Sequence, residues 1–106
     1  MSSDGETRLR RAEENEQALK AHNERHAVLE EEGGVAAADP VPFACECDDP
    51  DCGRAIAVPL GEYERAARRR DQFLVTPGHE DPTVEEVVER HAGYYVVSKP
   101  DMKRRR

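Results

Sequence analysis

The sequence is poor in the residues that build a large hydrophobic core. It contains no tryptophan, two phenylalanines and three tyrosines among 106 residues, and apolar residues make up only 37% of the chain. Aromatic and branched side chains supply most of the surface whose burial offsets the loss of chain entropy. The composition therefore excludes a large core and predicts one small domain with an appendage.

Long hydrophobic runs are also absent. The longest uninterrupted apolar runs, among them residues 35–38 and 94–97, are four residues, whereas a membrane-spanning helix needs about 20. No charged-then-apolar segment begins the chain, so we expect neither a membrane span nor a secretory signal. The expected location is the cytoplasm.

Positive charge is scarce outside the C-terminal end. The chain has 16 Lys and Arg against 23 Asp and Glu, a net charge of −7. Residues 99–106 carry five positive and one negative side chain, so the first 98 residues carry −11. This balance argues against a nucleic-acid surface on the body of the protein. If phosphate is bound at all, the candidates are basic residues of the tail and one internal run: Lys99, Lys103, Arg104, Arg105, Arg106 and Arg68 to Arg70.

Residues 6–32 have the composition of one long helix, with no proline or glycine and many Glu, Arg, Ala, Gln and Leu. Polar residues interrupt its thin apolar stripe, so the helix should dock on the protein or pair with a partner, a second copy included. Two interpretations stay open: a semi-solvated arm with charge pairs such as Glu16–Lys20, or a dedicated partner-binding helix. The stripe consists of Leu9, Ala12, Leu19 and Leu29, and the interruptions are Asn15, His22 and His26.

Residues 33–40 are predicted to form a linker, and residues 41–98 the compact unit. Gly33-Gly34 is typical of a helix end, and the prolines at 40 and 42 favour an extended entry. We expect extended segments at 41–47, 56–60 and 73–75, a short helix at 61–70 and a turn at Thr76-Pro77-Gly78.

The last part of this unit has two interpretations. Residues 83–90 and 94–98 are Val-rich and flank His91-Ala92-Gly93, which predicts a hairpin. The alternative is a helix at 83–91, because Thr83 and Glu86 have the spacing of a capping box. With the hairpin, the predicted fold class is α+β: a small zinc-stabilised module of short antiparallel strands and one short helix, preceded by the long helix.

A cluster of three cysteines indicates a metal site. Cys45 and Cys47 lie two positions apart on an expected extended segment, so both thiols project from one face. The acidic turn that follows brings Cys52 back toward them. In a chain without an export signal, an odd number of thiols indicates ligands more than disulfide bridges. Thiolates favour zinc or iron over the hard cations Ca²⁺ and Mg²⁺.

Zinc needs a fourth ligand for a closed tetrahedron, and His79 is the best candidate because it follows a rigid Pro-Gly turn. The alternatives are His91, the carboxylates of Asp48 or Asp51, or water. The predicted centre is therefore Zn²⁺ held by Cys45, Cys47, Cys52 and His79. A unit of about 58 residues is marginally stable without such help.

Several short blocks resemble a family of small uncharacterised actinobacterial proteins that pair an Asn-Glu-rich helix with a cysteine module. The resemblance covers about residues 8–99 and implies a zinc-binding unit in which His79 accompanies the three cysteines. It implies no particular activity. The matching blocks are residues 11–16, Asn23-Glu24-Arg25, Cys45-Glu46-Cys47, Asp51-Cys52, Glu62-Tyr63-Glu64, Pro77-Gly78-His79-Glu80 and residues 94–99.

No catalytic pattern accompanies the cysteines: the deaminase, metalloprotease and phosphate-loop signatures are all missing. A site closed by four protein ligands leaves no water to activate. The predicted function is a non-enzymatic zinc-binding interaction module, a cytoplasmic regulatory adaptor whose helix 6–32 binds an unknown protein. The alternatives are a thiol/zinc redox switch and a nucleic-acid-associated factor that uses the basic tail.

Overall fold

The computed structural model describes residues 4–49 and 51–99. It confirms the α+β class, and its short strands pair antiparallel as expected. In chain order the elements are α1 (Asp4–Glu32), β1 (Pro40–Ala44), β2 (Ala55–Pro59), α2 (Leu60–Ala67), β3 (Gln72–Val75), β4 (Glu86–Arg90) and β5 (Tyr95–Ser98).

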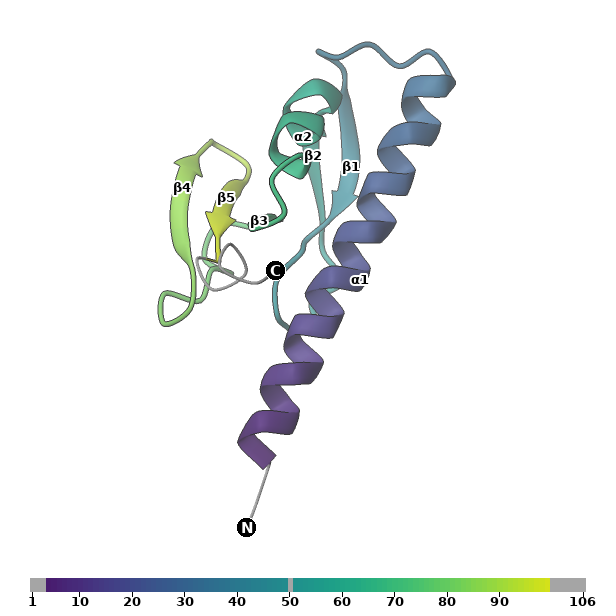
Figure 1. The fold of residues 1–106 in the computed structure, drawn as a ribbon. Helices are drawn as coiled ribbons and strands as arrows, with labels where there is room; N and C mark the ends of the chain where they lie inside the picture. The colour runs from purple at the N-terminus through teal and green to yellow at the C-terminus, as the bar shows by residue number, and fades with distance from the viewer. Residues whose placement is uncertain (1–3, 50, 100–106) are drawn as a thin grey trace.

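The strands form two small sheets, one of β1 and β2 and one in the order β3-β5-β4. Figure 1 shows α1 along one side of the molecule and the β4–β5 hairpin on the other, with β1, β2 and α2 between them. The N-terminal part of α1 extends beyond the sheets. The predicted helices and strands fall within a few residues of their observed bounds.

Alternating apolar residues explain the β1–β2 hairpin. Val41 and Phe43 of β1 and Ile56 and Val58 of β2 are buried, while their neighbours along each strand are mostly exposed. Prolines are tolerated here because each strand of a two-stranded sheet has a free edge. The Phe43 ring stacks on Tyr63 of α2 at 4.1 Å between ring centroids, which joins the hairpin to the helix.

The C-terminal segment is a hairpin, and the alternative helix at 83–91 is wrong. β4 and β5 pair antiparallel, with an irregularity between Val87 and Glu89. A single turn does form before β4, but Asp81 caps it instead of Thr83. The Asp81 side chain accepts from the Thr83 N–H at 3.1 Å, and the Asp81 carbonyl accepts from the Glu85 N–H at 2.8 Å. The chain then extends, since β5 is the central strand of its sheet and takes a partner on each side.

The docked face of α1 is polar. Its buried residues follow one helical stripe: Glu16, Lys20, Asn23 and Ala27. The apolar stripe of the sequence does not supply the docked face at Leu29, which is 62% exposed; the side chains of Leu9 and Ala12 lie outside the described residues. The sheets and α2, here called the module (residues 40–99), contact α1 through backbone carbonyls and charged groups. Polar side chains of the helix are therefore the ones that are buried.

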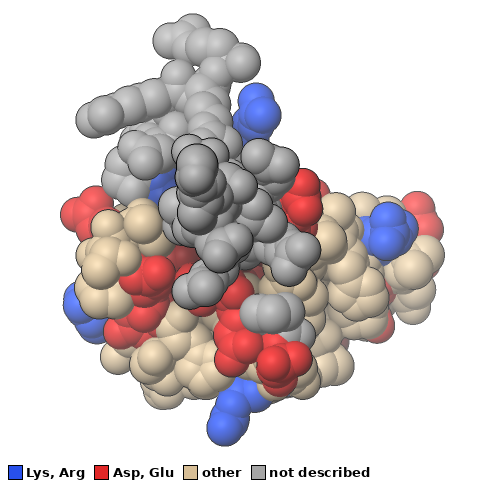
Figure 2. Space-filling view, turned by 90° about the horizontal axis from the view of Figure 1, so that it is seen from below, with Lys and Arg blue, Asp and Glu red and all other residues tan. Residues whose placement is uncertain are grey.

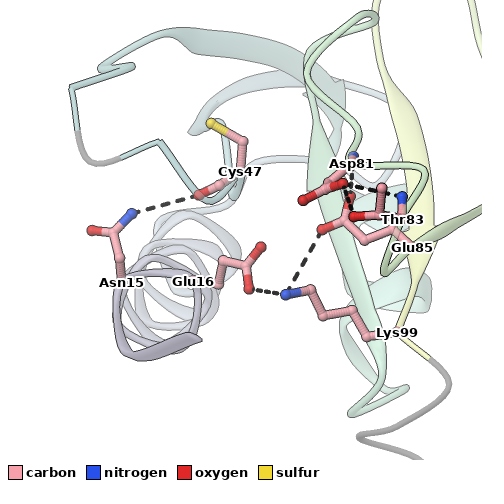
Figure 3. Close-up of polar contacts among 7 residues, drawn as sticks. All are labelled: Asn15, Glu16, Cys47, Asp81, Thr83, Glu85 and Lys99. Carbon is pink, nitrogen blue, oxygen red and sulfur yellow. Dashed lines mark hydrogen bonds and ion pairs between the residues drawn. The ribbon is translucent and has the colours of Figure 1, made fainter. Parts of the chain in front are cut away.

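Glu16 and Lys20 do not form the solvated pair expected of them. The Lys20 ammonium donates to the Gln72 carbonyl at 2.7 Å and lies 5.3 Å from the centroid of the Phe73 ring. Glu16 binds the ammonium of Lys99, which also lies 4.0 Å from Glu85 (Figure 3). Both charged residues therefore attach α1 to the module.

Lys99 is part of the compact unit rather than of a free tail. It is 7% exposed, and its backbone N–H donates to the Asp71 carbonyl at 2.8 Å. Its ammonium is buried against Glu16 and Glu85, so it is not available to a nucleic acid. Residues 100–106, including Lys103, Arg104, Arg105 and Arg106, lie outside the described residues.

Glu16 predicts a pH dependence of stability. Burial raises the pKa of Glu16 to about 7, an effect that Lys99 opposes and the Glu85 carboxylate reinforces. A carboxyl with a raised pKa binds its proton more tightly in the folded chain. Its stabilising contribution is therefore full below the unfolded pKa of about 4.5 and is lost as the pH rises through 7.

We expect Glu16→Gln to remove this loss, which amounts to at most about 3 kcal/mol for the shift involved. The measurement is the free energy of unfolding in denaturant at pH 5 and pH 8. Glu14→Gln, an exposed position on the same helix, serves as the control and should retain the wild-type decrease. Equal decreases in both variants would contradict the assignment to Glu16.

Candidate metal centre

Two separate parts of the chain bring the four predicted ligands together. Cys45 and Cys47 follow β1, Cys52 lies in the loop that leads to β2, and His79 follows β3. One ligand atom from each residue lies within 4.8 Å of every other, and these residues are the only such group in the described part of the chain. The three cysteines form no disulfide.

The cysteine loop is shaped by its acidic turn. Asp49 accepts from the Asp51 N–H at 2.9 Å through its side chain and from the Cys52 N–H at 3.1 Å through its carbonyl. Gly53 then adopts a positive φ of 61°, a conformation that glycine reaches without steric cost. These features reverse the chain and return Cys52 to the other two thiols.

His79 is positioned by a turn of type II. Its backbone N–H donates to the Thr76 carbonyl at 2.8 Å, with Pro77 at the second position and Gly78 at φ 93° at the third. The N–H of Thr76 also donates to the Cys45 sulfur at 3.2 Å. The turn therefore attaches the end of β3 to the cysteine loop and aims the imidazole at the thiols.

The distances fit a tetrahedral zinc ion. His79 Nδ1 lies 3.4 Å from the Cys52 sulfur and 3.8 Å from the Cys45 sulfur. Zn–S bonds of about 2.3 Å and Zn–N bonds of about 2.0 Å at tetrahedral angles separate sulfur and nitrogen by about 3.5 Å. Three sulfurs and one imidazole are also the donors that zinc prefers.

Burial sets the protonation of the thiols. Cys45 and Cys47 are 3% and 1% exposed, and burial raises the pKa of both thiols. Without a cation they hold their protons at neutral pH, and a bound metal displaces them. Cys52 and His79 are half-buried. Cys45 and Cys47 therefore form the buried side of the cluster, and Cys52 and His79 form the side nearer to solvent.

The alternative fourth ligands are occupied elsewhere or lie outside the group. His91 stacks on Tyr94 at 4.4 Å between ring centroids and contacts Glu89. Asp51 is exposed, and Asp48 interacts with Asp81 and Lys99. On α1, His26 packs edge-on against Phe43 and lies next to His22.

The candidate nucleic-acid residues are not gathered into a described site. Arg68 to Arg70 are exposed at the end of α2, and Lys99 is buried as described above. Figure 2 shows acidic side chains gathered across the face seen from below, with isolated Lys and Arg side chains among them. The described surface therefore offers no continuous basic face in this view.

Sequence reasoning missed the residues that support the cysteines from behind. Glu46 is 1% exposed and accepts three hydrogen bonds, from Asn23 Nδ2 at 2.8 Å, the Tyr63 hydroxyl at 2.9 Å and the Leu74 N–H at 2.7 Å. A signal was present: in an extended Cys-Glu-Cys segment, the glutamate must face away from the metal and into the protein. The donors that satisfy it could not be read from the sequence.

No family model matches this chain, and no match is found among curated proteins or among solved structures. The proposed resemblance to the actinobacterial family thus stays a prediction. None of the helices in residues 4–49 and 51–99 combines the length and apolarity that a membrane crossing requires.

Gly78→Ala tests the histidine turn. No atom lies within 4 Å of the position a new Cβ would take, so the cost comes from the positive φ alone; it is about 1–2 kcal/mol. We expect a metal affinity about tenfold weaker, measured by competition with a chelating indicator. Gly93→Ala is the matched control, because that loop glycine also has open space but no positive φ. Equal effects at both glycines would refute the role of the turn.

Proton release tests the state of the thiols. Because Cys45 and Cys47 have raised pKa values in the metal-free protein, zinc binding at pH 7 should release at least two protons. Calorimetric titration in two buffers of different ionisation enthalpy measures this number. Apparent affinity should fall as the pH is lowered, and release of less than one proton would contradict the prediction.

Proposed function

We propose that this protein is a non-enzymatic interaction module whose fold is stabilised by one zinc ion bound to Cys45, Cys47, Cys52 and His79. The observation that supports the proposal is the convergence of these four donors from two distant segments within 4.8 Å. Zinc fits better than iron as a resident structural ion because it has no redox chemistry and accepts a mixed sulfur and imidazole set.

The metal would join the two sheets. Three ligands belong to the loop of the β1–β2 hairpin, and the fourth follows β3 of the other sheet. Structural zinc contributes an apparent free energy of about 10–16 kcal/mol in small domains, comparable with the whole stability of a typical domain at about 5–15 kcal/mol. With so few aromatic residues in the core, the module would depend on this contribution.

A structural role is favoured over catalysis because four protein ligands complete the coordination of zinc and leave no position for a reacting water. The buried thiols support the same view. Raised pKa values at Cys45 and Cys47 keep them protonated when no metal is bound, and thiols are poor nucleophiles compared with thiolates. Burial of Cys45 and Cys47 weighs against the alternative of a redox switch, because it restricts the access of an oxidant.

The outward face of α1 is the surface we assign to a protein partner. Val28 and Leu29 are 50% and 62% exposed on the half of the helix that runs alongside the module. A regulatory adaptor in the cytoplasm would use such a helix to bind another protein, and three unpaired thiols suit a reducing compartment. Because Lys99 is buried, the nucleic-acid alternative now depends on the basic residues of the tail after it.

The test is native mass spectrometry of protein purified without tags or chelators, followed by thermal unfolding with and without a strong chelator. We expect one zinc per chain, and loss of the cooperative transition when the zinc is removed. His79→Ala should bind zinc at least about tenfold more weakly, and Cys47→Ser should lose it. His22→Ala, an exposed histidine on α1, is the control and should keep wild-type affinity.

Two results would overturn the proposal. One is a metal-free wild-type protein that unfolds cooperatively at the same temperature as the purified one. The other is zinc binding that His79→Ala leaves at wild-type strength.

A further inference from the structure

α1 binds the same short segment of chain that carries two of the metal ligands. In residues 44–47 the side chains of Cys45 and Cys47 reach the metal cluster, whereas the backbone of Ala44 and the carboxylate of Glu46 form hydrogen bonds with α1. Alternation along an extended chain places the Glu46 side chain opposite those of the two cysteines, because successive side chains point to opposite sides. The segment is therefore held between the metal centre and the helix.

Asn23 makes most of this contact. Its side-chain amide donates to the Ala44 carbonyl at 2.8 Å and to Glu46 at 2.8 Å, and its oxygen accepts from the Ala44 N–H at 2.9 Å. The amide thus pairs with the free edge of β1 as a neighbouring strand would. Asn23 is 0% exposed, so no water replaces these bonds while α1 is docked. About two helical turns earlier, Asn15 donates to the Cys47 carbonyl at 3.5 Å.

Glu46 extends the connection to the histidine side of the centre. Its carboxylate accepts from the Leu74 N–H at 2.7 Å, and its own N–H donates to the Leu74 carbonyl at 2.7 Å. Leu74 lies in β3, which leads directly into the turn that carries His79. One buried carboxylate therefore links α1 to both segments that supply ligands.

The docked face of α1 is suited to release. Apart from Ala27, its buried residues are Glu16, Lys20 and Asn23, all of which water solvates well. The helix ends at Gly33-Gly34, where Gly34 has a φ of 96°, before the chain enters β1. Undocking would thus expose little apolar surface on α1, and the docked state depends on correctly placed polar partners in the module.

We propose that Asn23 is a positioning residue of the metal centre, and that docking of α1 and binding of zinc strengthen each other through residues 44–47. The inference rests on the proposed zinc site and adds its regulation. By thermodynamic linkage, a partner that takes α1 away from the module weakens zinc binding by the same factor by which zinc strengthens docking.

The experiment compares full-length, zinc-loaded wild-type protein with Asn23→Ala at a temperature well below unfolding of either. Zinc release to a chelating indicator and hydrogen exchange of α1 amides are measured in the same samples. We expect the variant to bind one zinc, to release it at least about fivefold faster, at the low end of measured coupling factors, and to lose amide protection along α1. Arg25→Ala, exposed on the same helix, should match wild type in both measurements.

A second control separates positioning from general destabilisation. Val58 is fully buried in β2 and pairs with Val41, so Val58→Ala lowers stability without touching the contacts of Asn23. If Asn23→Ala accelerates zinc release no more than Val58→Ala, or exposes α1 while releasing zinc at the wild-type rate, the coupling is refuted and the zinc site stands. If the wild-type protein binds no zinc, the site itself is refuted and the coupling with it.

Discussion

The buried carboxylate of Glu46 is the constraint around which the molecule is organised. A carboxylate that is 1% exposed is costly unless its oxygens are satisfied. Its donors come from three elements, α1, α2 and β3, and each must be in place for the group to be buried. Burial raises the pKa of Glu46, an effect that these donors oppose. Satisfying the Glu46 carboxylate therefore holds α1, α2 and β3 together, which the small hydrophobic core alone could not do.

The parts of the structure that follow from local chemistry could be predicted from the sequence. Helix 6–32, the Gly33-Gly34 end and the Pro-Gly turn each depend on residues next to one another in the chain. The four-ligand cluster could be predicted for a similar reason: thiols two residues apart on an extended segment share a face, and a rigid turn presents the histidine. Only the distance between the two segments had to come from the fold.

The parts that could not be predicted depend on pairings between distant polar residues. The contact of Glu16 with Lys99 spans 83 positions, and neither residue has an unusual local sequence. Hydropathy placed Leu29 in the apolar stripe of α1, the side that packing arguments favour for contacts, and this stripe is not the docked face. Here the binding surface for the helix consists of carbonyls and charges, so the polar stripe is the buried one.

The spacing of the ligands has a consequence for the order of folding. Three sulfurs lie within eight residues, whereas the imidazole comes 27 positions after the last of them. The entropy lost in closing a chain loop grows with its length, so we expect a cation to bind the three sulfurs before the imidazole. On this expectation the β1–β2 hairpin would form first, and the strands around His79 would assemble as the histidine joins the coordination sphere.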